Sequence, residues 1–271
     1  MKHLKFAAAL FTAVAMGFSL AACGEENGGK DTPDNPNQGG GTSGGGTDPK
    51  PFVSNSNNTV VDGPIVASIT GQIGEGEDDY VANAEATVSL NALPATERAF
   101  DELQAQIGDT PQGGVMMVLA AMEVWANAGP TAGNACLKKC VADFTITEFV
   151  PVRLNEMFSS TDKNYARPYQ VAAFLVGAER KNGYNPTEPY TASMYVSPHH
   201  PYSYSSALDG TNITFQLRYQ GSGSESSKAT AITVVKPYGQ KYYLCTSWSS
   251  LYVRVAQLRG GEVFNGFKIV K

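Results

Sequence analysis

Residues that can hold a metal ion or perform nucleophilic chemistry are scarce in this sequence. Its 271 residues include only 4 cysteines and 3 histidines, and two of the histidines, His199 and His200, are adjacent. A zinc site in a protein needs several converging nitrogen, sulfur or oxygen ligands. We therefore expect no metal and no cofactor. Cys136 and Cys140 lie four residues apart on one face of a predicted helix, and we interpret them as small buried side chains.

Positive charge is also low. The chain carries 20 lysines and arginines against 25 acidic residues, which gives a formal net charge of −5. Proteins that bind nucleic acid present clustered positive charge, so nucleic acid is not an expected partner. The 4 cysteines permit few disulfides, and the sequence is long enough to bury a core without them.

The N-terminal residues have the pattern of a bacterial lipoprotein signal peptide. Lys2 and Lys5 flank the start of an apolar run, Phe6–Ala22, that has the length of a signal-peptide core. Leu20-Ala21-Ala22-Cys23 resembles the lipobox, at which the lipoprotein peptidase cleaves. We predict that residues 1–22 are removed. The alternative, an uncleaved membrane helix, is disfavoured because a polar Gly-rich segment follows at once, without a cluster of stop-transfer charges.

Lipid on Cys23 would then attach the protein to a membrane. Several acyl chains on one residue make such attachment stable, whereas a single chain is marginal. The next residue is Gly24 rather than aspartate, which by resemblance to the lipoprotein sorting rules of bacteria with two membranes implies the outer membrane. Glu25 and Glu26 resemble a short acidic signal for export to the cell surface. Surface and periplasmic orientations therefore both stay open.

A flexible spacer is predicted between the lipid and the folded part. Residues 23–58 are rich in Gly, Pro, Asn, Asp and Thr and contain few large apolar side chains. Such a segment buries too little surface to offset the entropy lost on ordering. At random-coil dimensions it would hold a domain about 30 Å from the membrane. Residues 59–271 are long enough for one domain with its own core, and we expect a single domain there.

The hydrophobic pattern of this domain changes its period along the chain. Helical periodicity dominates before Asn182-Gly183, and alternation with a period of two dominates after it. The pattern predicts an α+β fold, in which a helical N-terminal half packs on a C-terminal antiparallel β-meander. The expected helices are 96–106, 111–129, 133–143, 148–158 and 169–178, and the expected strands are 65–70, 85–90, 190–196, 211–219, 230–235, 241–245 and 251–255.

Several short segments of the predicted domain carry a resemblance to a known family. They are Thr110-Pro111-Gln112-Gly113-Gly114-Val115, Gly133-Asn134-Ala135-Cys136-Leu137, Asn182-Gly183-Tyr184-Asn185-Pro186, Pro189-Tyr190-Thr191, Pro201-Tyr202-Ser203-Tyr204, Tyr242-Tyr243-Leu244 and Ser249-Ser250-Leu251. These segments resemble a family of domains of unknown function in bacterial secreted and anchored proteins. Together they cover most of residues 60–255. The resemblance implies a single α+β domain. Because the family has no established activity, it implies no site.

The first function that fits these observations is a non-catalytic module of the cell envelope. Such a module would bind a glycan, a peptide or another envelope protein, or would have a structural role in a larger envelope complex. The C-terminal half is rich in tyrosine, and the apolar ring and polar tip of tyrosine suit binding surfaces. For a binding role the candidate residues are Tyr202 and Tyr204, with His199 and His200 beside them.

The alternative is a cell-surface hydrolase that acts on glycans or peptides. Such an enzyme needs two carboxyl groups with separated pKa values, or a nucleophile beside a general base. Asp78, Asp79, Glu123 and Glu188 are available, but no spacing marks a pair. The segment Ser197–Pro201 is typical of an exposed turn rather than of a serine–histidine site. We therefore name no catalytic residue.

Overall fold

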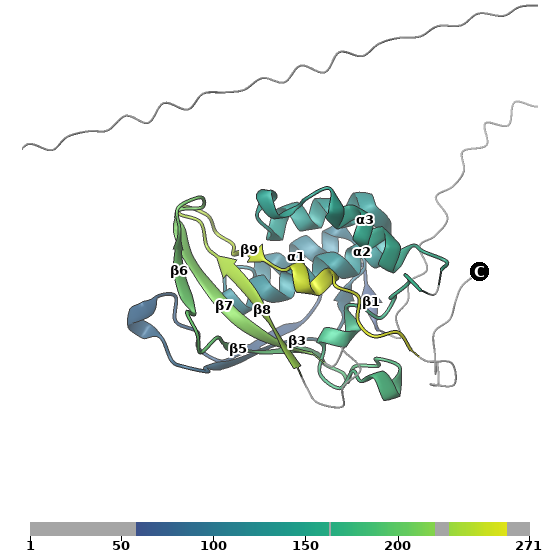
Figure 1. The fold of residues 1–271 in the computed structure, drawn as a ribbon, viewed down its shortest axis with the longest axis horizontal. Coiled ribbons are helices and arrows are strands. Elements are labelled where there is room, and N and C mark those ends of the chain that lie inside the picture. The colour runs from purple at the N-terminus through teal and green to yellow at the C-terminus, as the bar shows by residue number, and fades with distance from the viewer. Residues whose placement is uncertain (1–57, 163, 220–227, 259–271) are drawn as a thin grey trace, which may run out of the picture. The chain divides into compact units, whose positions relative to one another are not determined.

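The computed structural model describes residues 58–162, 164–219 and 228–258. The predicted signal peptide, Cys23 and nearly all of the predicted spacer lie outside the described residues, so the lipidation site stays a prediction from sequence. The described part has the predicted α+β fold, with helices packed against a mostly antiparallel sheet of seven strands (Figure 1).

The sheet combines strands from both ends of the described chain. Its strands are β2 (Ala67–Thr70), β3 (Glu85–Leu90), β5 (Tyr190–Val196), β6 (Tyr202–Ser205), β7 (Gly210–Tyr219), β8 (Lys228–Val235) and β9 (Leu244–Ser247). They follow the order β2-β3-β5-β7-β8-β9, and β6 pairs with the first half of β7, next to the part that pairs with β5. The expected meander is therefore extended by the hairpin β2–β3, because β3 pairs along its whole length with β5.

Burial alternates along the central strands, as the period of two predicts. β5 alternates buried and half-buried residues from Tyr190 to Val196, and β7 buries Ile213, Phe215 and Leu217. On the more open face, hydroxyl groups of neighbouring strands meet: Ser89 Oγ lies 2.8 Å from Thr191 Oγ1. One face of the sheet thus packs on the helices and the other meets water.

A second, two-stranded sheet is parallel and pairs β1 (Val60–Val61) with β4 (Leu93–Pro94). Strand β4 of this sheet comes just before α1 (Glu97–Ile107) in the sequence. Thr96 caps this helix, since its Oγ1 accepts a hydrogen bond from the Ala99 N–H at 3.3 Å. The remaining helices are α2 (Pro111–Cys140) and α3 (Phe149–Phe158).

Helix α2 is the central helix of the core. All of its residues from Pro111 to Ala126 are buried, and it contacts α1, α3 and the strands β3, β8 and β9. A kink divides it at Gly129, whose φ of +86° and ψ of −179° are accessible essentially to glycine alone. The break expected at Gly129-Pro130 is confirmed. The segment after the kink ends at Cys140, three residues before the end of the expected helix 133–143.

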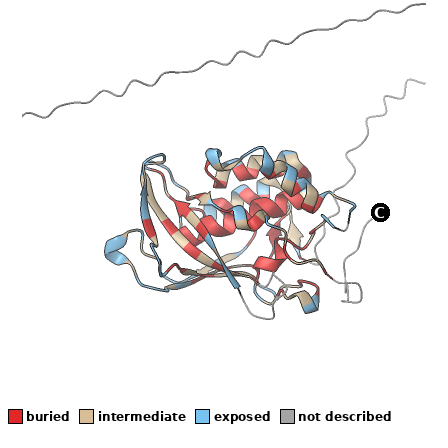
Figure 2. Cartoon of the chain, viewed as in Figure 1, coloured by how far each residue is buried: buried red, intermediate tan, exposed pale blue. Residues whose placement is uncertain are grey.

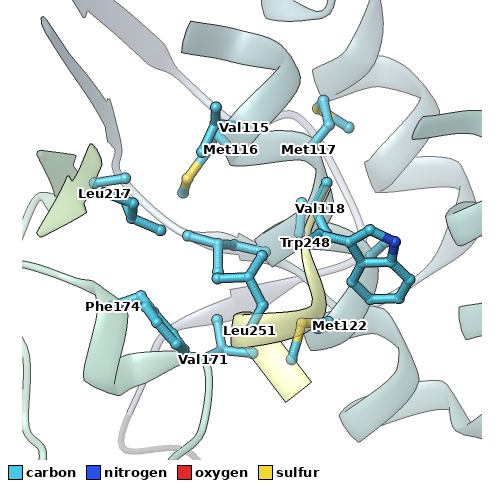
Figure 3. Close-up of a cluster of buried hydrophobic side chains, with 14 of the residues drawn as sticks. Val115, Met116, Met117, Val118, Met122, Val171, Phe174, Leu217, Trp248 and Leu251 are labelled. Carbon is cyan, nitrogen blue, oxygen red and sulfur yellow. The ribbon is translucent and has the colours of Figure 1, made fainter. Parts of the chain in front are cut away.

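The core lies between α2 and the sheet. Figure 2 shows the buried residues concentrated where the helices face the strands. In the close-up of Figure 3, Met116, Met117 and Met122 of α2 lie around Trp248 and Leu251. Unbranched methionine side chains fill irregular space of this kind. In the described residues, no helix combines the length and apolar character needed to cross a membrane.

Two of the expected elements are wrong. Residues 169–178 contain only a short 3₁₀ turn, η3 (Ala172–Phe174), and residues 251–255 are not a strand, because another 3₁₀ turn, η5 (Ser249–Tyr252), leads into an extended segment. A short apolar run fits a helix, a strand or a covered loop equally well. Tertiary contacts decide the conformation of both segments. The strand β6, which the sequence analysis does not predict, likewise forms through a tertiary contact, its pairing with β7.

A buried amide explains the loop at 251–255. The Gln170 side chain is fully buried, and its Nε2 donates to the backbone carbonyls of Leu251 and Val253, both at 2.8 Å. Its Oε1 accepts a hydrogen bond from the Val255 N–H at 3.0 Å. Gln170 therefore satisfies the backbone groups that a neighbouring strand would otherwise satisfy.

Candidate functional site

Of the residues proposed from sequence for binding, Tyr202 is largely buried. It is 7% exposed, at the start of β6. Its hydroxyl donates a hydrogen bond to the Gly74 carbonyl at 2.8 Å, and its ring packs edge-on against Tyr80, with 5.6 Å between the ring centroids. The loop that contains Gly74 connects β2 and β3. Tyr202 thus holds this loop against β6 and offers little ring surface to a ligand.

Tyr204 is open to solvent. Its side chain is 67% exposed, and its hydroxyl hydrogen-bonds with the Asp209 carboxylate at 2.5 Å. This hydrogen bond joins the two ends of the turn between β6 and β7. Because the phenol donates to a carboxylate, the pKa of Tyr204 is raised. Tyr204 therefore leaves most of its ring accessible to a partner.

His199 and His200 lie in the exposed turn before β6, as the sequence suggested. His200 has a φ of +45°. Ser197 Oγ donates to the His199 carbonyl at 3.1 Å and accepts from the His199 N–H at 3.4 Å, so these two bonds shape the turn through the backbone of His199. The four candidate residues are close in sequence but differ in exposure, and they do not form one open surface.

Two other C-terminal aromatic side chains, Tyr243 and Trp248, add nothing to this surface. Tyr243 is 2% exposed and Trp248 is 1% exposed, and Trp248 Nε1 donates to Thr145 Oγ1 at 3.0 Å. Burial, followed by a hydrogen bond with Glu75, raises the pKa of Tyr243. These rings belong to the core, which is the usual place for strand aromatics.

The three cysteines of the folded domain are buried free thiols: Cys136, Cys140 and Cys245. Burial raises the pKa of Cys136 and of Cys245 to about 12, and it raises the pKa of Cys140 well above its usual value. Thiols of this kind are poor nucleophiles and poor metal ligands, because both roles need the thiolate.

The acidic residues considered for a hydrolase differ in burial. Asp78 and Asp79 are exposed in η1 (Glu77–Asp79). Glu123 is 4% exposed in α2 and accepts a hydrogen bond from Asn127 Nδ2 at 3.1 Å. In residues 58–162, 164–219 and 228–258, three or more His, Cys, Asp or Glu side chains never gather in a way that could hold a metal ion.

A pocket that the sequence analysis did not identify lies beside the segment that Gln170 holds. Its volume is about 360 Å³, at the lower end of the range of about 300–1,000 Å³ found for small-molecule sites. Its lining residues are Phe174, Tyr219, Ser250, Val253, Arg254, Val255 and Ala256. The rings of Phe174 and Tyr219 pack at 5.3 Å between centroids. The lining is therefore mainly apolar and aromatic.

Two polar side chains interrupt this apolar lining. Arg254 is the one charged residue among the described residues that line the pocket. The hydroxyl oxygen of Ser250 is buried and has no hydrogen-bond partner within the described part of the chain. A buried hydroxyl of this kind costs free energy unless something hydrogen-bonds with it. In the sequence, the only signal for the pocket is an arginine inside the apolar run Leu251–Val255.

Arg254 also belongs to a chain of charged and aromatic groups on the surface of α3. One oxygen of Glu156 contacts two guanidinium groups, Arg153 at 2.9 Å and Arg254 at 3.1 Å. Arg153 lies over the Phe149 ring at 4.7 Å, and Arg254 lies over the Tyr165 ring at 4.9 Å. One carboxylate thus faces two cations, which leaves the group with a net positive charge next to the pocket.

A family model described as a domain of unknown function (DUF6935) matches residues 92–259. The matched region begins just before α1 and includes α2, the C-terminal strands and all the residues that line the pocket. No curated protein and no solved structure matches the chain.

Proposed function

The chain belongs to the DUF6935 family of domains of unknown function, so its function has to be inferred from its own residues, and we propose that it is a lipid-anchored protein of the cell envelope. In this proposal, lipid on Cys23 attaches it to the outer membrane. Its domain acts as a non-catalytic module that binds a ligand at the membrane surface.

The observation that carries the anchoring proposal is the sequence Leu20-Ala21-Ala22-Cys23 after an apolar run. Each part of the signal is in the expected order: positive residues, apolar core, small residues, cysteine. The Gly-rich and Asn-rich spacer that follows suits a protein that is held near a membrane but folds away from it.

Binding rather than catalysis is supported by the environment of the reactive groups. The cysteine thiols are buried and have raised pKa values. His199 and His200 are exposed, and Glu123 lies inside α2. A general acid and a general base must both lie within hydrogen-bond reach of the reacting group of a substrate. These residues belong to separate parts of the domain, so they do not form such a pair.

Labelling in cells tests the anchor. The full-length chain is expressed in a bacterium with two membranes, and the N-terminal peptide is analysed by mass spectrometry after growth with labelled fatty acid. We expect a diacylglycerol-modified Cys23 and recovery of the protein in the outer-membrane fraction. Cys23→Ser should abolish both, whereas Cys136→Ala should keep both. Unmodified Cys23 in the wild-type protein would refute the proposal.

Protease treatment of intact cells tests the orientation. Digestion of the domain without cell lysis would place it on the surface, in line with the acidic Glu25-Glu26 pair. Protection until lysis would place it in the periplasm. A substitution of both glutamates by serine, compared with substitution of Asp31 and Asp34 further along the spacer, identifies whether the position of the acidic pair matters.

A further inference from the structure

We propose that the pocket beside η5 binds a small monocarboxylic acid with an apolar body. The acid would place its carboxylate at Arg254 and its apolar part on Phe174 and Tyr219. This inference rests on the proposed binding role of the domain and names the class of ligand that the role involves. It does not depend on the membrane anchor.

The apolar lining residues of the pocket favour a ligand with an apolar body. Phe174 and Tyr219 offer ring surface, and Val253, Val255 and Ala256 add aliphatic surface. Val253 is 63% exposed, although it lies in a segment whose neighbours Leu251 and Val255 are buried. An aromatic or aliphatic group that enters the pocket would remove this surface from water, which is favourable in proportion to the apolar area buried.

The two polar side chains of the lining, Arg254 and Ser250, favour a ligand with a carboxylate. A guanidinium prefers a planar carboxylate, which it can bind through two parallel hydrogen bonds. Ser250 Oγ needs a hydrogen-bond partner in the buried state, and a carboxylate oxygen can accept its proton. A neutral apolar molecule would leave Ser250 Oγ without a partner and would gain no ion pair with Arg254, so it should bind less well.

Because Glu156 pairs with Arg254, the proposed role of Arg254 predicts opposite changes in acid binding when each of the two residues is replaced. Glu156 holds Arg254 through the same oxygen that contacts Arg153, so it competes with any incoming carboxylate for the guanidinium. Glu156→Gln removes the charge but keeps the shape of the side chain and an oxygen that can accept a hydrogen bond, so the variant tests the charge alone. Glu156→Gln should therefore strengthen the binding of an acid, whereas Arg254→Gln should weaken it.

The backbone that carries the pocket is fixed before any ligand arrives. Gln170 holds the carbonyls of Leu251 and Val253 and the N–H of Val255. Arg167 Nε adds a hydrogen bond to the Val255 carbonyl at 2.8 Å. A wall held in this way loses little conformational entropy on binding, which favours affinity for a small ligand.

The test uses the full-length protein in lipid nanodiscs and two probes of nearly equal shape, 3-phenylpropionate and 3-phenylpropanol. Isothermal titration calorimetry measures each affinity, and titration of empty nanodiscs is subtracted. We expect saturable binding of the acid, about tenfold tighter than that of the alcohol, because a hydrogen-bonded ion pair adds about this factor. Octanoate replaces the aromatic probe to compare ring and chain.

Four variants complete the test. Arg254→Gln should lower the affinity for the acid about tenfold and leave that for the alcohol unchanged. Ser250→Ala should lower the affinity for the acid severalfold, and Glu156→Gln should raise it severalfold. The control is Arg98→Gln on α1, which removes an arginine paired with Asp62 and Glu102 and should change neither affinity.

Three outcomes would overturn the proposal. They are the absence of saturable heat with the acid at millimolar concentration, equal affinities for acid and alcohol, and a loss of binding in Arg98→Gln as large as in Arg254→Gln. Failure of this titration leaves the fatty-acid labelling of Cys23 unaffected, so the two proposals can fail separately. Equal melting temperatures of the variants show that a change in affinity is not a change in folding.

Discussion

The side-chain oxygen of Gln170 accepts a hydrogen bond from the Val255 N–H at 3.0 Å, across 85 residues of sequence. Together with its two donated bonds, this contact makes one amide the partner of three backbone groups in a segment without a strand neighbour. The same segment forms a wall of the pocket. The shape of the pocket thus depends on a residue that does not line it.

Replacement of Gln170 should therefore be costly. Gln170→Leu keeps the volume but leaves three buried backbone groups without partners, and each unsatisfied group costs about 1–3 kcal/mol. We expect the free energy of unfolding, measured by urea denaturation, to fall by about 3 kcal/mol or more. Gln106→Leu on the exposed side of α1 is the control and should change it by less than about 0.5 kcal/mol. Equal effects would contradict the role assigned to Gln170.

Gly133 should not tolerate a side chain. A Cβ atom added there would lie 2.5 Å from Trp125 Cβ, because the kink at Gly129 brings the two segments of α2 together. Overpacking of a rigid core costs about 1–3 kcal/mol, so Gly133→Ala should lower the unfolding free energy by this amount. Gly63→Ala, where a Cβ would have no atom within 4 Å, serves as the matched control in the same urea titration.

The cap of α1 should show a dependence on pH. Thr96 accepts from the Ala99 N–H and donates to Asp62 at 2.6 Å, and this bond, with a smaller contribution from Arg98, lowers the pKa of Asp62. A carboxyl group with a lowered pKa in the folded state stabilises the fold above its ordinary pKa, and this contribution is lost as the pH falls through the lowered value. Thr96→Ala should cost about 1 kcal/mol for the cap, with an additional cost at pH 7 that shrinks as the pH falls below the ordinary pKa of aspartate.

Urea denaturation of the wild type and Thr96→Ala at pH 7 and at pH 2 measures this difference. The matched control is Thr70→Ala, which removes an exposed hydroxyl that pairs with Thr87 Oγ1 and not with a carboxylate. Its cost should be the same at the two pH values. A cost for Thr96→Ala that does not shrink on acidification would mean that Asp62 gains nothing from this contact.

The domain cysteines should be unreactive in the folded protein. With a pKa of about 12 for Cys136 and Cys245, the thiolate fraction at pH 8 is about a thousandfold below that of an ordinary thiol, whose pKa is about 8.5. Iodoacetamide should label the three domain thiols only after unfolding, with the extent read by mass spectrometry. Rapid labelling of any of them in the native protein would show that the thiol is accessible and ionised.

Single substitutions of Tyr202 and Tyr204 should differ in how much they lower the free energy of unfolding. Tyr202→Phe removes the buried hydrogen bond to the Gly74 carbonyl and should lower the unfolding free energy by about 1 kcal/mol, with a further loss on Tyr202→Ala. Tyr204→Ala acts on an exposed ring and should change it by less than about 0.5 kcal/mol. Thermal and urea unfolding of the single variants measure both effects. Equal destabilisation would contradict the difference in burial.

Local patterns were enough for several elements. β3 and β5 have the residues that alternation indicates, α1 begins within one residue of its expected start, and α2 breaks at Gly129. These features depend on residues that are near one another in sequence, such as a hydroxyl three residues before an N–H group. The polar candidates at His199 and His200 were placed in an exposed turn for the same reason.

Long-range contacts decided the rest. The burial of Tyr202 depends on a loop 128 residues away, and the position of Arg254 beside the pocket depends on Glu156, 98 residues away. The sequence by itself determined the positions of α1, α2 and α3, most strands, the α+β class and the predicted lipobox, because each depends on a short local pattern. Only the tertiary structure decided the pairing of β3 with β5, the loop at 251–255 and the pocket, since burial and hydrogen-bond partners depend on which distant segments meet.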